Sequence, residues 1–240
     1  MSEMLTLDGR PVELEDGQSI MDAALAAGVY IPHLCHDAAV PASGNCRLCT
    51  VRVNGHLMAA CTSAAAPGQH VENDTAELRE LRRTLIRLLF VEGNHICPSC
   101  EKSGDCKLQA LAYYLEVRDF VFPQLRPQHE VDASHPDVLL DRDRCILCQL
   151  CVRASRELDG KGVFDVGGRG VSSRLIVNSA SGSLGDSSLA VTDRAVAICP
   201  VGALLVKRRG FGVPIGQRTY DRQTVDGRPR PPAGNGSRHG

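Results

Sequence analysis

Cysteine spacing constrains this 240-residue chain more than any other feature, because 11 cysteines fall into three groups. The groups have four, three and four members: Cys35, Cys46, Cys49 and Cys61; Cys97, Cys100 and Cys106; and Cys145, Cys148, Cys151 and Cys199. A zinc ion or an iron–sulfur cluster normally takes four protein ligands, so only the middle group is one short. We expect several small modules, each held together by a metal centre.

Composition and charge narrow the class of protein further. Aromatic residues make up 4% of the chain and Trp is absent, which argues against a single large core. The net charge is −1, and the only basic run is "KRR" at 207–209, so a nucleic-acid partner is not expected. The N-terminus lacks the basic start and apolar run of a signal peptide, and no segment approaches the roughly 20 apolar residues of a membrane span. We therefore expect a soluble, cytoplasmic protein without membrane insertion, whose clustered cysteines bind metal rather than form disulfides.

Residues 1–74 are predicted to form a β-grasp module. Asp8-Gly9 and Asn54-Gly55 are hairpin turn signals between short strand-like segments. The segment 19–28 between the hairpins is predicted to be a helix, with Ser19 as N-cap, Asp22 completing a capping box and Gly28 as the stop. Two hairpins crossed by one helix are typical of that fold.

Residues 75–118 are predicted to be a short helical domain. Leucines at 78, 81, 85 and 88 or 89 recur at helical spacing, with Asp74 and Glu77 as the cap and Gly93 as the end. A second helix follows Cys106, so the middle cysteines lie in the loop between the two helices. We interpret the leucine stripe as core.

The remainder divides into three parts. Residues 119–140 contain three prolines and no clear period, as expected of an extended connector. Residues 141–219 carry the third cysteine group and are predicted to be an α+β domain like a bacterial ferredoxin. Residues 220–240 are rich in Pro, Gly and Arg and are expected to be disordered.

The third cysteine group has the most specific spacing. Cys-x2-Cys-x2-Cys with a remote Cys-Pro is the bacterial ferredoxin pattern, and Cys199 is followed by Pro200. The position that would serve a second cluster after Cys151 is Ser155, and none of Ala195, Thr192 and Leu189 is a cysteine. We expect one [4Fe-4S] cluster on these four cysteines. The alternative is a zinc site, although zinc ribbons use two separated cysteine pairs.

The first group resembles the plant-type ferredoxin order with a longer first loop. Its cysteines are separated by 10, 2 and 11 residues, and Gly44 lets backbone N–H groups approach the sulfurs. A [2Fe-2S] cluster is expected. Four structural cysteines or two disulfides are the alternative.

The middle group needs a fourth ligand, for which His95, Glu101 and Asp105 are candidates. Imidazole suits iron better than carboxylate does and replaces cysteine in Rieske centres. We expect His95 with Cys97, Cys100 and Cys106 around a [4Fe-4S] cluster. A three-cysteine [3Fe-4S] cluster with His95 at the surface, or a zinc site with three cysteines and one histidine, are the alternatives.

The order of the three sites resembles the N-terminal iron–sulfur region of the complex I large electron-transfer subunit. The segments "LFVEGNHICPSCEKSGDCKLQALAY", "DRDRCILCQLCV" and "AICPVGALLVKRRGFGVPIGQRTY" are more similar still to the small iron–sulfur diaphorase subunit of NAD-reducing [NiFe] hydrogenases. One departure from complex I is that only Ile96 separates His95 from Cys97, where those subunits usually place three residues.

The resemblance implies a subunit of a multisubunit oxidoreductase without a complete active site of its own. Its partners would be an FMN/NAD-binding diaphorase subunit and the small and large [NiFe] hydrogenase subunits, between which it would relay single electrons. The sequence agrees, because "GGRG" at 167–170 lacks the spacing of a dinucleotide fingerprint and no catalytic constellation is evident.

Three other functions stay open at this stage. The chain could serve as the equivalent relay in an NAD-dependent formate dehydrogenase or a complex I-like dehydrogenase. It could also be a zinc-stabilised binding scaffold or a free-standing ferredoxin. The colour of the purified protein separates zinc from iron–sulfur, since zinc sites are colourless.

Overall fold

The computed structural model describes residues 3–119, 121–125 and 128–230. Its N-terminal part is a five-stranded sheet in the order β2-β1-β5-β3-β4. The strands are β1 (Met4–Leu7), β2 (Arg10–Glu13), β3 (Thr50–Val53), β4 (His56–Ala59) and β5 (His70–Glu72). Only β1 and β5 pair in parallel; the other pairs of this sheet are antiparallel.

One helix, α1 (Ile20–Ala26), packs on this sheet and completes the expected β-grasp module. Its Ile20 and Met21 share a buried cluster with Leu5, Leu7 and Val51 of the strands. The predicted capping box is present, because Asp22 N–H donates to the Ser19 hydroxyl at 3.1 Å and Ser19 N–H donates to the Asp22 carboxylate at 3.2 Å.

Both hairpin turns have the backbone that their sequences predict. Asp8 and Gly9 adopt φ of 49° and 78°, and Asn54 and Gly55 adopt 47° and 87°. Two consecutive left-handed residues are the signature of a type I′ turn, whose twist matches that of the paired strands.

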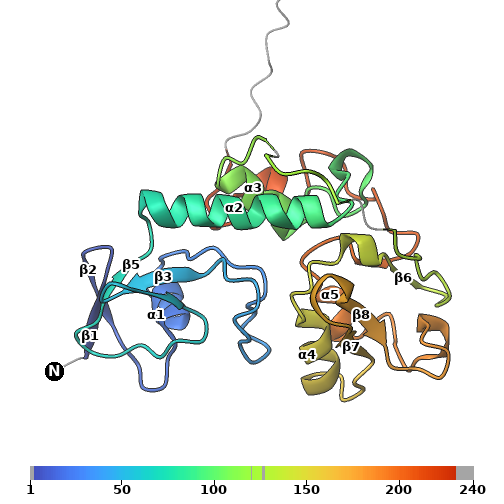
Figure 1. Cartoon of the computed structure of the whole chain (residues 1–240), viewed down its shortest axis with the longest axis horizontal. Helices are drawn as coiled ribbons and strands as arrows, with labels where there is room; N and C mark the ends of the chain where they lie inside the picture. The colour runs from blue at the N-terminus through green and yellow to red at the C-terminus, as the bar shows by residue number, and fades with distance from the viewer. Residues whose placement is uncertain (1–2, 120, 126–127, 231–240) are drawn as a thin grey trace, which may run out of the picture.

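The long helix α2 (Ala76–Glu92) runs above both the sheet module and the C-terminal module (Figure 1). Its N-cap is Thr75, whose hydroxyl accepts the Leu78 N–H at 3.2 Å, and not Asp74 as expected. Asp74 instead pairs with Arg79. The predicted leucine stripe is only partly the core face, because Leu88 is exposed. The residues of α2 that are buried are Leu78, Arg82, Ile86, Phe90 and Val91.

The second helix of the pair is α3 (Lys107–Tyr114), which starts directly after Cys106 as predicted. Its buried residues Leu108 and Leu111 belong to the core cluster that also contains Ile86 and Phe90. The loop between α2 and α3 contains a short 3₁₀ helix, Cys97–Ser99, which begins at the first cysteine of the middle group.

The C-terminal module has the small α+β architecture expected of a single-cluster ferredoxin domain. Two antiparallel strand pairs, β6 with β9 and β7 with β8, accompany two short helices. The elements are β6 (Val138–Leu140), α4 (Leu150–Glu157), β7 (Phe164–Gly167), β8 (Arg174–Val177), α5 (Arg194–Ala197) and β9 (Leu204–Val206). Ser155 is fully buried and its hydroxyl accepts the Val163 N–H at 2.8 Å, so this position serves packing.

The end of the chain differs from the expected disorder over residues 220–230. A short helix, α6 (Thr219–Arg222), is tied to the loop of the middle cysteines, because Tyr220 N–H donates to the Gly104 carbonyl at 2.8 Å and Thr219 N–H donates to Asp105 at 2.8 Å. Arg230 lies over the Tyr113 ring at 5.8 Å. Polar and aromatic anchors therefore order a segment whose composition alone suggests disorder; residues 231–240 lie outside the described residues.

Within the described ranges, none of the helices is both long and apolar enough to cross a membrane.

Candidate metal centres

The first site lies at the edge of the β-grasp module, where four thiols meet. Cys35, Cys49 and Cys61 are buried and Cys46 is half-buried. The Cys49 and Cys61 sulfurs are 3.3 Å apart, and Cys46 N–H donates to the Cys35 sulfur at 3.3 Å. The structure thus brings together all four cysteines predicted from the sequence, and none of them forms a disulfide.

The thiols of the first site are close enough to share protons. The hydrogen bond between Cys49 and Cys61 lowers the pKa of Cys49 to about 7, and hydrogen bonds with Cys46 and Cys61 hold the pKa of Cys35 well below its usual range. Hydrogen bonds with Cys35 raise the pKa of both Cys46 and Cys61. Thiolates are the form that binds iron, so this arrangement of thiols and N–H donors fits a cluster.

The loop around Cys46 has the backbone that a cluster loop needs. Gly44 and Arg47 both adopt left-handed conformations, with φ of 67° and 56°. Arg47 is not a glycine, and such strain persists where the surroundings dictate it. Backbone N–H groups reach the sulfurs here, since Leu34 N–H donates to the Cys46 sulfur at 3.5 Å and Cys46 N–H donates to the Cys35 sulfur. The strained Arg47 was not predictable from the sequence.

Two histidines flank Cys35 and were not singled out from the sequence. His33 is buried, its Nδ1 lies 2.7 Å from the Ile31 carbonyl, and burial lowers its pKa to about 3. His36 packs edge-on against His33 and lies 3.9 Å from Asp22. His36 Nδ1 is buried without a hydrogen-bond partner among the described residues, so the named contacts satisfy only the His33 ring. The four thiols complete the predicted ligand set without either histidine.

The second site is a cavity with about 330 Å³ of empty space between α2, α3 and the C-terminal module. His95, Cys97, Cys100 and Cys106 all line it, together with Phe90, Ser103, Leu108, Gln109, Arg144 and Gly202. The structure therefore gathers the predicted histidine and three cysteines around one space. Burial raises the pKa of Cys106 to about 12.

The side chain of His95 lines this cavity and has a ring nitrogen that is free to bind a metal. Its Nε2 is buried without a hydrogen-bond partner, while the ring also has a backbone hydrogen bond to Leu89. Because Nε2 is unpartnered, that bond belongs to Nδ1, which fixes the tautomer with the Nε2 lone pair free. Desolvation lowers the pKa of His95 to about 4, so the ring is neutral near pH 7. An orphaned buried nitrogen beside three thiols fits a cluster iron.

The carboxylates considered as alternatives point elsewhere. Neither Glu101 nor Asp105 lines the cavity. Glu101 pairs with Arg144 at 2.9 Å, and Asp105 accepts the Thr219 N–H at 2.8 Å. His95 is thus the one of the three candidates that shares the cavity with the cysteines.

Two glycines shape the second site. A Cβ on Gly202 would lie 2.8 Å from the Cys100 sulfur, and a Cβ on Gly93 would lie 2.5 Å from His95 Nε2. Real Cβ atoms do not approach so closely, so both positions require glycine for space rather than for φ. From the sequence, Gly93 was predicted only as the end of a helix, and no local pattern marks Gly202.

The third site is an apolar cavity with about 360 Å³ of empty space. Its sulfurs come from Cys145, Cys148, Cys151 and the distant Cys199, with Leu147, Val166, Leu175, Val201 and Leu204 among the residues that line it. Burial raises the pKa of all three cysteines of the tight triplet, that of Cys145 to about 11. A metal cation that binds such thiols displaces their protons, so the four thiols of this site fit a metal centre.

The triplet loop carries two left-handed residues that sequence reasoning did not foresee. Leu147 and Gln149 adopt φ of 49° and 59°, and neither is glycine. They alternate with the cysteines, so the chain wraps round the cavity before α4 begins at Leu150. As in the first site, backbone strain coincides with the metal-ligand spacing.

Through the described parts of the chain, no group of three or more His, Cys, Asp or Glu side chains is arranged to hold a single metal ion. The second and third sites are instead cavities with donors on several walls.

Three family models match the chain in the order of the three sites. Residues 4–76 match a 2Fe-2S iron–sulfur cluster binding domain, residues 82–120 match the NADH-ubiquinone oxidoreductase-G iron–sulfur binding region, and residues 138–206 match a 4Fe-4S single cluster domain. The fold and the sites define an iron–sulfur electron-transfer protein with a [2Fe-2S] domain followed by [4Fe-4S] domains.

Relatives of similar length specify the family. The chain is 42% identical to the gamma subunit of the NAD-reducing hydrogenase HoxS of Cupriavidus necator, over 95% of this chain and 97% of the relative. A chain in the crystal structure of NAD⁺-reducing [NiFe]-hydrogenase in the H₂-reduced state superposes with a TM-score of 0.92 at 52% identity, covering 95% of this chain and 97% of that one. The protein belongs to the family of NAD-reducing hydrogenase gamma subunits.

Complex I proteins are more distant relatives. The mitochondrial 78 kDa component of the NADH-ubiquinone oxidoreductase of Candida albicans is 31% identical over 86% of this chain, which spans only 29% of that protein. The similarity to the N-terminal region of such proteins, expected from the motifs, is confirmed.

Proposed function

We propose that this chain relays single electrons between a [NiFe] hydrogenase module and an FMN/NAD-binding diaphorase partner. It would act as an oxidoreductase subunit whose chemistry belongs to bound clusters, while the protein sets their positions and surroundings. Its relationship to hydrogenase gamma subunits over nearly the whole chain supports this assignment.

One structural observation carries the proposal. A single buried cluster of side chains contains cysteines from all three sites, namely Cys35, Cys106, Cys148, Cys151 and Cys199. The second and third sites also meet directly, because Lys107 N–H donates to the Pro200 carbonyl at 2.8 Å and Arg144 donates to the Cys100 sulfur at 3.7 Å. Sites packed in one core form a continuous route, which a set of independent structural metal sites would not need.

The proposed ligands are the side chains that meet at each site. Cys35, Cys46, Cys49 and Cys61 would hold a [2Fe-2S] cluster. His95, Cys97, Cys100 and Cys106 would hold one [4Fe-4S] cluster, and Cys145, Cys148, Cys151 and Cys199 a second. The matches of residues 82–120 to an iron–sulfur binding region and of residues 138–206 to a 4Fe-4S single cluster domain support these assignments.

The proposed domains are 1–74 for the [2Fe-2S] module, 75–118 for the helical module and 141–219 for the ferredoxin-like module, with 119–140 as connector. We also propose a cytoplasmic location, because three oxygen- and oxidant-sensitive thiolate sites suit a reducing compartment.

A second candidate is the equivalent relay subunit of an NAD-dependent formate dehydrogenase or a complex I-like dehydrogenase. The complex I relatives favour it, yet this chain matches less than a third of their length. The hydrogenase assignment is preferred since that relative is matched end to end.

Reconstitution with the partner subunits tests the relay. The full complex should reduce NAD⁺ with hydrogen, and omission of this chain should abolish the coupled reaction. Dye reduction by hydrogen on one half and by NADH on the other should survive the omission. Coupled activity without this chain, or activity only with a formate-oxidising partner, would contradict the hydrogenase relay.

A further inference from the structure

The side chain of Arg153 bridges the junction between the first and third sites. This residue lies on α4, two positions after Cys151. Its Nη2 donates to the Cys35 carbonyl at 2.7 Å and to the Cys148 carbonyl at 3.3 Å. One guanidinium nitrogen therefore contacts the backbone of a first-site cysteine and of a third-site cysteine.

The remaining donors of Arg153 strengthen the same connection. Nη1 donates to the Pro41 carbonyl, in the loop between Cys35 and Cys46, and Nε donates to the Gln149 carbonyl at 3.2 Å. The planar fork of an arginine fixes the relative placement of its acceptors, which a lysine ammonium does less well. Four bonds thus set how the first-site loop sits against the third-site loop.

The charge of Arg153 has no carboxylate counterpart. All four of its acceptors are backbone carbonyls, and in the part of the chain that the structure describes no Asp or Glu forms an ion pair with it. Other arginines of the chain differ, since Arg144 pairs with Glu101 and Asp141, and Arg87 pairs with Glu80 and Asp119. Arg153 is half-buried, so solvent screens its charge only in part.

We propose that Arg153 is a positioning residue which holds the first and third sites together and, through its uncompensated charge, raises the reduction potentials of both. Reduction adds negative charge to a cluster, and a nearby cation stabilises the reduced form. Hydrogen bonds to the carbonyls of ligand residues act in the same direction. The inference rests on the proposed function, because it concerns electron flow between those two sites.

The test uses the full chain in its complex, with redox titration of each cluster followed by EPR. Arg153→Gln keeps hydrogen-bond donors but removes the charge, so the midpoint potentials of the first-site and third-site clusters should fall together. The potential of the second-site cluster should stay at its wild-type value. Arg153→Lys restores the charge and should return both potentials toward wild type.

Arg156→Gln is the matched control, since Arg156 lies on the same helix, is 60% exposed and pairs with Asp165 at 3.6 Å. It should move none of the three potentials. Unchanged potentials in Arg153→Gln, a shift at only one of the two sites, an equal shift in Arg156→Gln, or an Arg153→Lys variant that behaves like Arg153→Gln would each overturn the proposal. Loss of iron in Arg153→Gln would also overturn it, by making the residue a structural clamp only.

The result for the Arg153 variants is independent of whether the proposed function is correct. The wild-type complex either couples hydrogen to NAD⁺ or does not, whereas the Arg153 proposal is decided by the potentials of the variants.

Discussion

At the scale of single residues, His95 decides whether the second site has four protein ligands. Its Nε2 is buried and unpartnered, and Phe90 holds the ring edge-to-face at 5.4 Å. The neutral tautomer set by Leu89 is the form that donates a lone pair to metal.

Exchanging His95 for cysteine tests that assignment. His95→Cys should retain the cluster and lower its reduction potential, because thiolate adds a negative charge that neutral imidazole lacks. His95→Ala should lower the iron content or convert the cluster, since neither of the other two candidate ligands lines the cavity. EPR-monitored redox titration provides the measurement, and a potential unchanged in His95→Cys would show that His95 is not a ligand.

The candidate donors could be selected at this scale. Metal-ligand spacing singled out all 11 cysteines and His95 as candidate ligands, because spacing along the chain is a property of the primary structure. Gly202 and Arg153 were missed since their roles depend on neighbours roughly 100 residues away or more: Cys100 for the glycine, and Cys35 for the arginine. Such contacts leave no local pattern.

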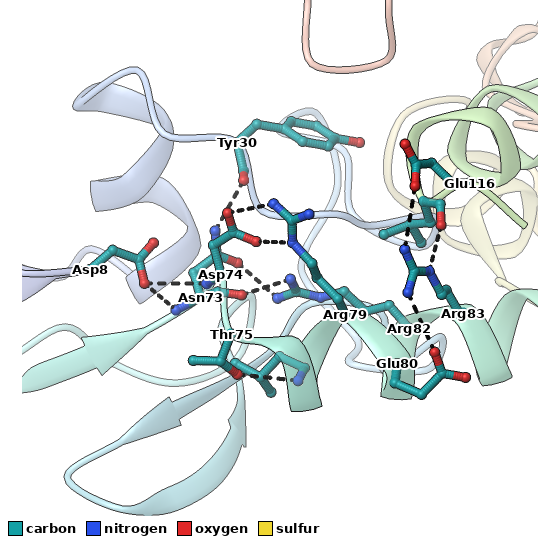
Figure 2. Close-up of polar contacts among 12 residues, drawn as sticks. Asp8, Tyr30, Asn73, Asp74, Thr75, Arg79, Glu80, Arg82, Arg83 and Glu116 are labelled. Atoms are coloured by element: carbon teal, nitrogen blue, oxygen red, sulfur yellow. Dashed lines mark hydrogen bonds and ion pairs between the residues drawn. The ribbon is translucent and has the colours of Figure 1, made fainter.

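At the scale of elements, α2 joins the β-grasp module to the remainder through a buried arginine. Arg82 is 2% exposed and donates to the Leu48, Thr50 and Asn73 carbonyls at 2.8 to 3.0 Å and to the Asn73 side chain at 2.8 Å. Figure 2 shows it reaching Asn73 beside the exposed pair of Arg79 and Asp74. The acceptor Leu48 immediately precedes Cys49, so this contact also supports the first site.

Removing that side chain should be costly. Arg82→Met leaves several buried carbonyls without donors, and we expect the unfolding free energy to fall by about 3 kcal/mol. The measurement is the temperature at which the visible absorption of the first cluster bleaches, together with proteolysis near residues 73–76.

Arg79→Met is the control on the same helix. Arg79 is 55% exposed and its pair with Asp74 should contribute less than about 1 kcal/mol. Equal effects of the two substitutions would mean that Arg82 does not tie the helix to the sheet module.

The third site offers a second test at this scale, because Cys199 comes from a different element than the triplet. Cys199→Ser should remove one cluster, about 4 iron per chain, and loosen residues 141–210, since ligation energy is folding energy in so small a module. Iron analysis and hydrogen exchange measure the two effects. A variant with full iron content would disprove the pairing of Cys199 with the triplet.

Local signals predicted which segments form helices and hairpins, but not which faces of the helices are buried. The hairpin turns and the α1 capping box were readable because turn and cap chemistry is local. The core face of α2 was not, since the stripe includes an arginine whose burial depends on carbonyls of the sheet module. Propensity and periodicity carry no information about such partners.

At the scale of the whole molecule, the modules are less separate than their motifs suggest. The β-grasp module has a buried cluster of its own, yet Leu34, Cys35, Val40 and Leu48 belong to the core that extends through α2 and α3 to the C-terminal strands. The cysteine-bearing loops share that core. The described tail residues 219–230 also return to the second site, which the Pro, Gly and Arg composition did not reveal.

An electron relay requires its clusters to lie in one shared core, whereas independent structural metal sites do not require it. The most direct test of three clusters in one chain is iron and acid-labile sulfide on anaerobically purified protein, with EPR of the dithionite-reduced sample. We predict about 10 iron and about 10 sulfide per chain, for one [2Fe-2S] and two [4Fe-4S] clusters. About 6 iron with bound zinc would contradict this prediction, because the second site would then be a structural zinc site and the chain would carry only two clusters.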